Sequence, residues 1–242
     1  MSGMFSSDPT PGEIQFRLGS IPVRIQPWFW LTAFLLAGPW FDQEPRPWPV
    51  VTFVAVCFAS IVWHELGHAW TMRYFGARYV EIMLTGLGGL ATSQSRQSHT
   101  WQRIVVALAG PANQLLIWGI LFGLIKLKLI SISPDNQIFY ILIIQILMVN
   151  LYWPLFNLLP IFPLDGGRVV RESAMALLGN RGMRASLWVS IVICGGMIAW
   201  IVAAGGSMFN AMIFGMMLAN NIQEIQFLRD QDRYRDPSDW RS

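Results

Sequence analysis

The stretch SIVWHELGHAW, residues 60–70, places two histidines and a glutamate inside a run of otherwise apolar residues. His64 and His68 are four positions apart, so on a helix both imidazoles project from one face about one turn apart, and Glu65 lies one position further round. A charged side chain at the middle of a membrane helix costs about 2.5–3.5 kcal/mol on insertion scales. If the stretch lies in a membrane, its polar groups therefore need a compensating partner.

The composition indicates a membrane protein. The chain has 242 residues, of which 54% are hydrophobic and only 13% charged, and its mean hydropathy is +0.44. This composition is too apolar and has too few charged residues for an ordinary soluble domain. A membrane-spanning helix needs roughly 20 residues, and six apolar segments are candidates: 27–41, 48–75, 101–127, 137–159, 185–204 and 207–225.

We therefore expect an all-α integral membrane fold with about six transmembrane helices. Residues 27–226 would form one membrane-embedded domain, between a cytoplasmic N-terminal segment, 1–26, and a cytoplasmic tail, 227–242. The first apolar segment follows no compact basic region and has no clear cleavage site, so it is predicted to be an anchor rather than a removable signal peptide.

The basic residues are distributed unevenly. Of the 17 lysines and arginines, only Arg46, Lys126 and Lys128 fall on one side of the predicted membrane, and the others share the side of both termini. The positive-inside rule places that side in the cytoplasm. The net charge of +3 is explained by this distribution, so no nucleic-acid partner is expected. Cys57 and Cys194 lie within predicted spans without metal-type spacing, which is typical of small buried apolar residues.

Residues 77–100 differ from the helical pattern around them. They begin as an alternating, β-prone run and become Gly-rich and polar. This pattern predicts a small re-entrant β-hairpin between the second and third helices, near residues 80–92. Non-helical backbone at membrane depth is tolerated only where protein covers it or where it lines a wet cavity, so the hairpin implies a cavity.

The spacing of His64, Glu65 and His68 is the His-Glu-x-x-His arrangement of zinc sites. The two histidine nitrogens can occupy two corners of a tetrahedron, and the glutamate can accept a proton from water that the metal activates. Two buried histidines could instead simply hydrogen-bond to neighbouring helices. A bound divalent cation explains all three costly groups together, so the sequence favours a zinc site.

A catalytic zinc usually has three protein ligands, so a third ligand must come from elsewhere in the chain. Asp135 is predicted on the opposite side of the membrane, His99 lies in a polar linker, and Glu81 would have to fold back from the hairpin. Asp165 lies in NLLPIFPLDGGR, residues 157–168, an apolar segment broken by prolines and followed by two glycines. It could serve only as the N-cap of the next helix. Because the histidine pair already indicates a metal site, we favour the interpretation of Asp165 as its third ligand.

Three motifs together resemble the site-2 protease family of intramembrane zinc metalloproteases: HELGH at 64–68, AGPANQ at 109–114 and NLLPIFPLDGG at 157–167. The resemblance extends from about residue 21 to the C-terminal helices. We expect a compact member without a PDZ or CBS domain, whose hairpin strands correspond to the membrane-embedded strands that pair with an unwound substrate in that family.

The resemblance also implies roles for individual residues. One zinc ion would be bound by His64, His68 and Asp165, and Glu65 would be the catalytic acid and base. Asn157 would hold the substrate or stabilise the oxyanion, and Asn113 would support the active site.

Packing offers alternatives for several of these motifs. Pro111 interrupts the third helix and its small neighbours allow close helix approach, so Asn113 could be only a helix–helix hydrogen bond. Asn150 and Asn157 are seven apart and could form a polar stripe. The glycine pairs at 195–196 and 205–206 could permit lateral opening for substrate, or could be packing sites and a turn.

The expected function is zinc-dependent hydrolysis of peptide bonds in or near transmembrane segments of membrane protein substrates, as in regulated intramembrane proteolysis. We expect a bacterial inner membrane location, with the active site opening to the cytoplasm and with membrane lipid around the helices. One rival is a catalytically silent scaffold or regulator of the same fold, which would not need the Glu65 base. A metal transporter would need further acidic or histidine residues in other spans, and the interiors of the other predicted spans have none.

Overall fold

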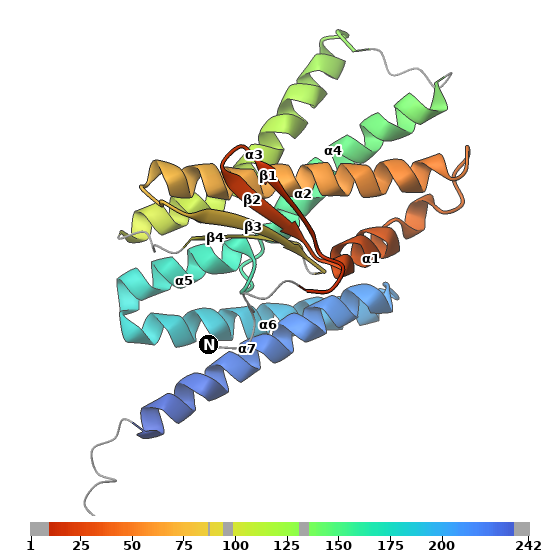
Figure 1. Ribbon diagram of the computed structural model, residues 1–242. Coiled ribbons are helices and arrows are strands. Elements are labelled where there is room, and N and C mark those ends of the chain that lie inside the picture. Colours follow the sequence, from red (N-terminus) through yellow and green to blue (C-terminus); the bar gives the residue numbers. More distant parts are fainter. Residues whose placement is uncertain (1–9, 87, 94–98, 131–135, 235–242) are drawn as a thin grey trace, which may run out of the picture. The chain divides into compact units, whose positions relative to one another are not determined.

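The computed structural model describes residues 10–86, 88–93, 99–130 and 136–234 (Figure 1). The chain forms two compact units, Met1–Phe156 and Asn157–Ser242, which are considered separately below. The first unit contains a four-stranded sheet and the helices around it, and the second contains three helices.

The sheet combines the N-terminal segment with the hairpin. Its strands β1 (Ile14–Leu18), β2 (Ile21–Ile25), β3 (Val80–Thr85) and β4 (Gly88–Ser93) lie in that order. The pairs β1–β2 and β3–β4 are antiparallel, whereas β2 and β3 are parallel, with Val23 opposite Ile82. Alternate residues of β2 and β3 are buried, as a sheet with one covered face requires. β4 is an edge strand.

The strands β1 and β2 correct the expectation that the only β structure is a hairpin between two helices. Their signal is present in the sequence, because the apolar residues alternate in IQFRL and again in IPVRI. Gly19 has φ 61° and occupies the first position of a two-residue loop, where a hairpin turn favours glycine. A salt bridge between Arg24 of β2 and Glu81 of β3, 3.5 Å long, joins the two halves of the sheet.

The parallel connection from β2 to β3 contains α1 (Pro27–Leu36), the short 3-10 helix η1 (Gly38–Trp40) and α2 (Trp48–Tyr74). α2 ends where Gly76 adopts φ 90°. The N–H of Gly76 donates to the carbonyl of Arg73, and the N–H of Ala77 donates to that of Met72. This is the Schellman pattern that ends a helix and turns the chain, here into β3.

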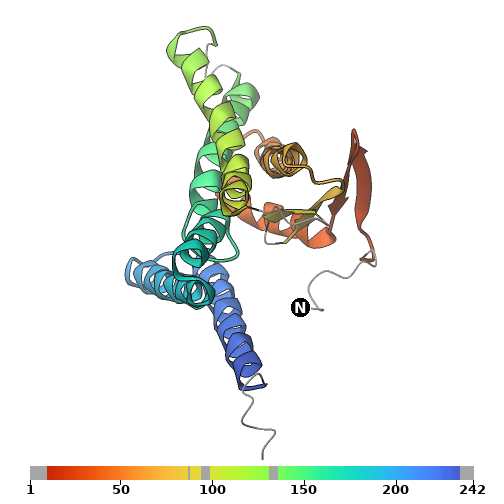
Figure 2. The same cartoon turned by 90° about the vertical axis from the view of Figure 1, so that its left-hand side faces the viewer.

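α2 is covered on two sides. Strands β3 and β4 pack on one side of it, and α3 (Thr100–Lys126) packs on another (Figure 2). An added Cβ at Gly67 would lie 2.5 Å from the carbonyl oxygen of Ala109, so α2 and α3 approach closely at this glycine. The helix α4 (Gln137–Asn157) is joined to α2 by hydrogen bonds from Gln145 to Pro49 and from Asn150 to Ser60. This double cover explains why polar side chains of α2 can be buried.

The second unit consists of α5 (Asp165–Leu178), α6 (Asn180–Ala203) and α7 (Met208–Tyr234). The loop before α5 is held at Phe162. Its N–H donates to the hydroxyl of Ser190 on α6, and its carbonyl accepts a hydrogen bond from the amide of Asn221 on α7. The loop is therefore fixed to both long helices of its own unit.

Four helices of the described residues are long and apolar enough to cross a membrane: α2, α3, α4 and the Arg181–Ala203 part of α6. This finding agrees with an integral membrane protein that is largely helical. The predicted span 27–41 forms the ten-residue helix α1 and the 3-10 helix η1, and 207–225 is part of α7. The count of six spans and the single domain 27–226, which would extend over both units, stay predictions.

Candidate metal centre

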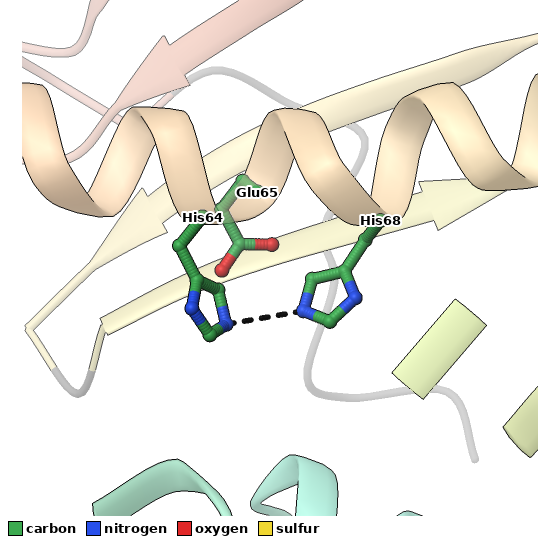
Figure 3. A group of neighbouring side chains, drawn as sticks. All are labelled: His64, Glu65 and His68. Carbon is green, nitrogen blue, oxygen red and sulfur yellow. Dashed lines mark hydrogen bonds between the residues drawn. The ribbon is translucent and has the colours of Figure 1, made fainter. Parts of the chain in front are cut away.

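Two imidazoles and one carboxylate of α2 gather in the buried part of that helix (Figure 3). His64, Glu65 and His68 are 2%, 4% and 2% exposed, and their candidate ligand atoms all lie within 4.8 Å of one another. The Nε2 atoms of the two histidines are 3.1 Å apart. Two nitrogens bound at about 2.05 Å to one tetrahedral zinc would be about 3.3 Å apart. The pair is therefore spaced as two ligands of one ion.

The other ring nitrogen of each histidine faces an oxygen that can only accept. The Nδ1 of His68 lies 2.6 Å from the backbone carbonyl of Val106. The Nδ1 of His64 lies 2.9 Å from Oε1 of Gln114, whose amide nitrogen donates to the carbonyl of Ser60. Both Nδ1 atoms must therefore carry the proton, because a carbonyl oxygen has none to donate.

A neutral imidazole has only one N–H, so these tautomers leave a lone pair on each Nε2. With both rings neutral, the two lone pairs face each other across 3.1 Å, an arrangement that a shared proton or a metal ion beside them would stabilise. The hydrogen bonds thus present both histidines as metal ligands through Nε2. Proteins usually orient metal-binding histidines by a hydrogen bond from the ring nitrogen that does not bind the metal.

Space beside the two nitrogens is provided by Gly110 on α3. A Cβ added at this position would lie 2.3 Å from Nε2 of His68 and 2.6 Å from Nε2 of His64, closer than a carbon atom can approach. Only glycine leaves this space open. The donor set, the tautomers and this glycine together fit a resident metal ion.

Glu65 lies beside the two histidines and also contacts the sheet. A Cβ added at Gly89 of β4 would lie 2.4 Å from its Oε1, so the carboxylate packs directly against the backbone of the edge strand. In Figure 3 the carboxylate projects toward the same region as the two imidazoles. Glu65 therefore lies next to both the candidate metal position and the edge strand.

Asn113 forms the interhelical contact that the sequence left open as an alternative. Its Nδ2 donates to the carbonyl of Trp63 at 2.7 Å, and the indole N–H of Trp63 donates to the Asn113 carbonyl at 3.1 Å. This reciprocal pair fastens α3 to α2 beside the histidines. The role of Asn113 in the chemistry stays a prediction.

Asp165 and Asn157 belong to the second unit, and their ligand and substrate roles stay predictions. Asp165 is 5% exposed, and its Oδ1 lies 3.7 Å from Nη1 of Arg168. The N-cap alternative is wrong, because α5 begins at Asp165 itself and its cap residue is Leu164. A Cβ at Gly166 would lie 2.1 Å from the carbonyl of Leu158, so this part of the helix start packs directly on the preceding backbone.

The other candidates for a third ligand are engaged or lie elsewhere. Glu81 accepts hydrogen bonds from Arg24 at 3.5 Å and from Tyr79 at 3.3 Å. His99 is exposed just before α3, where its backbone N–H donates to Gln102. Asp135 lies outside the described residues.

Sequence reasoning missed Gln114, the Val106 carbonyl and Gly89. Gln114 belongs to the quoted AGPANQ motif, and its position four residues after Gly110 would have placed both on the same face of α3. A backbone carbonyl leaves no signal in the sequence.

The comparisons with known proteins agree with this arrangement. Residues 52–133 match Peptidase family M50. A protein of Synechocystis sp. described as a zinc metalloprotease, sll0528, is 34% identical over 205 residues, which are 79% of this chain and 52% of that protein. Zinc metalloprotease MJ0392 of Methanocaldococcus jannaschii is 30% identical over 156 residues, 64% of this chain and 43% of that protein. The chain thus spans about half the length of these relatives.

The fold is also that of a solved structure. The Site-2 Protease from Methanocaldococcus jannaschii superposes with a TM-score of 0.63 at 22% identity, covering 88% of this chain and 94% of that one. In this chain the apolar helix α2 carries the His-Glu-x-x-His motif and is covered by a small sheet and a second helix. The chain is therefore similar to peptidase family M50 over residues 52–133 and to the site-2 protease in its fold, and its donor cluster fits the zinc that we predicted.

Proposed function

We propose that this protein is an intramembrane zinc-dependent endopeptidase that hydrolyses peptide bonds in or near transmembrane segments of membrane proteins. The observation that carries the proposal is the His64, Glu65 and His68 cluster, with both Nε2 atoms presented as ligands, on a helix that is apolar enough to cross a membrane. The relatives named as zinc metalloproteases support it.

His64 and His68 would bind the ion, and Asp165 would be the third protein ligand. Zinc, when bound, supplies a Lewis acid that polarises the substrate carbonyl and makes water acidic enough to lose a proton near neutral pH. The hydrogen bonds from Nδ1 of each histidine keep both rings oriented toward the ion.

Glu65 would take the proton from the attacking water and deliver it to the departing amine, which requires one carboxylate next to both. Its packing against the Gly89 backbone keeps it close to the edge strand, where a substrate peptide would lie. Asn157 would hold the substrate or stabilise the oxyanion, and Asn113 would support the site through its bonds to Trp63.

A peptide bond within a helix is shielded by its own turns, so the substrate must be locally extended before it can be cut. The outer edge of β4 could pair with such a segment through main-chain hydrogen bonds. His68 and His64 lie 8 and 12 residues before Gly76, which is about 12–18 Å along a helix. The hydrolysis would therefore occur within the thickness of the bilayer.

The location follows from the distribution of basic residues. We propose six crossings of a bacterial inner membrane, with both termini and the opening of the active site in the cytoplasm. The parallel pairing of β2 with β3 supports this arrangement, because it requires the segments before α1 and after α2 to lie on the same side.

The test compares wild type with Glu65→Gln, both purified in detergent, with Glu44→Gln as a control at an exposed glutamate. Zinc content and cleavage of a single-span membrane substrate are measured for each. The proposal predicts about one zinc per chain in all three proteins and cleavage by wild type and Glu44→Gln only. Zinc without cleavage of any of a panel of substrates by wild type would favour a silent scaffold. Absence of zinc from wild type would overturn the proposal.

A further inference from the structure

The buried glutamine Gln114 touches the metal cluster without being a candidate ligand. It lies on α3, is 0% exposed, and has both ends of its amide engaged with α2. Its oxygen accepts from Nδ1 of His64 at 2.9 Å, and its nitrogen donates to the carbonyl of Ser60 at 3.1 Å.

The direction of this amide is not free to change. The Ser60 carbonyl can only accept, so it must face the NH₂ end of Gln114, and the oxygen end must then face His64. Ser60 is one helical turn before His64, so the amide joins two consecutive turns of α2 along one face. A flipped amide would place two acceptors together at Ser60.

We propose that Gln114 is a positioning residue for the metal centre: it holds His64 in the tautomer that presents Nε2 and fixes the angle of that ring. His68 does not need such a side chain, because the backbone carbonyl of Val106 does the same for it. The inference rests on the proposed zinc site and adds a residue that acts through His64 rather than on the substrate.

The chain provides a matched control in Gln145 on α4. Both glutamines are 0% exposed, and each donates its amide nitrogen to a backbone carbonyl of α2, Ser60 for Gln114 and Pro49 for Gln145. They differ at the oxygen. That of Gln114 meets His64, whereas that of Gln145 has no partner among the described residues.

The experiment uses Gln114→Met, Gln145→Met and Gln114→Glu, prepared in detergent beside wild type. Zinc affinity is measured by competition with a chromogenic chelator, and thermal unfolding is recorded for every protein. Loss of an outer hydrogen-bond partner typically costs 10–100-fold in metal affinity. We expect that loss for Gln114→Met, wild-type affinity for Gln145→Met, and only partial recovery in Gln114→Glu, because its carboxylate can still accept from His64 while its other oxygen would face the Ser60 carbonyl to which Gln114 donates.

Nitrogen-15 spectra of histidine-labelled protein give a second readout. The chain has three histidines, and the exposed His99 is an internal reference. In zinc-loaded wild type, His64 should show a protonated Nδ1 and a metal-bound Nε2. In zinc-loaded Gln114→Met the His64 signals should broaden or shift, while those of His68 stay in place.

The outcomes separate this inference from the proposed function. Equal losses of zinc affinity in Gln114→Met and Gln145→Met would mean that both glutamines serve packing only, and would overturn the inference while leaving the zinc site intact. Wild-type affinity in Gln114→Met would overturn it as well. Wild type that binds no zinc would overturn the proposed function and the inference together.

Discussion

Gly110 is the position at which one added methyl group should weaken metal binding without unfolding the protein. In Gly110→Ala the new carbon would lie 2.3 Å and 2.6 Å from the two Nε2 atoms. Ordinary contact needs about 3.5 Å, so each imidazole would have to retreat by about 1 Å. Each ring is also hydrogen-bonded through Nδ1, to Gln114 or to Val106, so retreat would strain those bonds too.

The size of the effect follows from the cost of overpacking. An extra methyl group in a packed interior typically costs 1–3 kcal/mol. If that cost falls on the zinc-binding geometry, affinity should decrease about 5- to 150-fold. Alanine favours a helix interior more than glycine, so helix α3 itself should not be weakened.

The assay is chelator competition for zinc, with thermal unfolding recorded alongside. Gly119→Ala and Gly123→Ala are controls on the same helix, because an added Cβ at either position meets nothing within 4 Å. We expect both controls to bind zinc as wild type does. Wild-type zinc affinity in Gly110→Ala would show that the two Nε2 atoms do not share an ion at this place.

Three further predictions follow from contacts around the site. In Gly89→Ala the new Cβ would overlap the carboxylate of Glu65, which is the proposed base and not a zinc ligand, so proteolysis should decrease at least tenfold while zinc is retained. Equal loss of zinc and of proteolysis would contradict these separate roles. Asn113→Ala removes the hydrogen bond to the Trp63 carbonyl and should lower the free energy of unfolding by about 1 kcal/mol in a denaturant titration, with zinc affinity unchanged. The hydrogen bond from Arg24 lowers the pKa of Glu13, so the pair should stabilise the fold above the ordinary glutamate pKa, and this stabilisation should be lost as the pH falls through the lowered pKa. The unfolding midpoint of Glu13→Gln should therefore depend less on pH below about pH 4 than that of wild type. Identical pH dependence of the two midpoints would refute the pairing.

The long apolar helices and the zinc motif could be predicted from sequence because their signals are local. A run of apolar residues and a spacing of four between His64 and His68 need no knowledge of the rest of the chain. The hairpin of β3 and β4 was predicted for the same reason. The alternation of apolar residues in β1 and β2 is also a local signal, but the N-terminal segment was interpreted for its charge, for a signal peptide and for the family resemblance, and not for strands.

The surroundings of the metal ligands could not be predicted in the same way. Which oxygen meets Nδ1 of each histidine depends on how α2 and α3 pack against each other, with their close approach where Gly67 meets Ala109. The identity of the third zinc ligand depends on tertiary structure in the same way. Asp165 was selected for its chemistry and its motif, and its distance from His64 depends on tertiary structure.

The parallel pairing of β2 with β3 has a consequence for the biogenesis of the protein. About sixty residues separate the paired positions Val23 and Ile82, so β2 leaves the ribosome well before its neighbour is made, and the closure of such a long loop delays their pairing. During that interval Ile21, Val23 and Ile25, which are almost fully buried in the finished sheet, have no cover from β3. Helix α2 must be inserted before the sheet can close on it. A bulky fusion that restrains the N-terminal segment should therefore interfere with assembly at a late stage, after the spans are in the membrane.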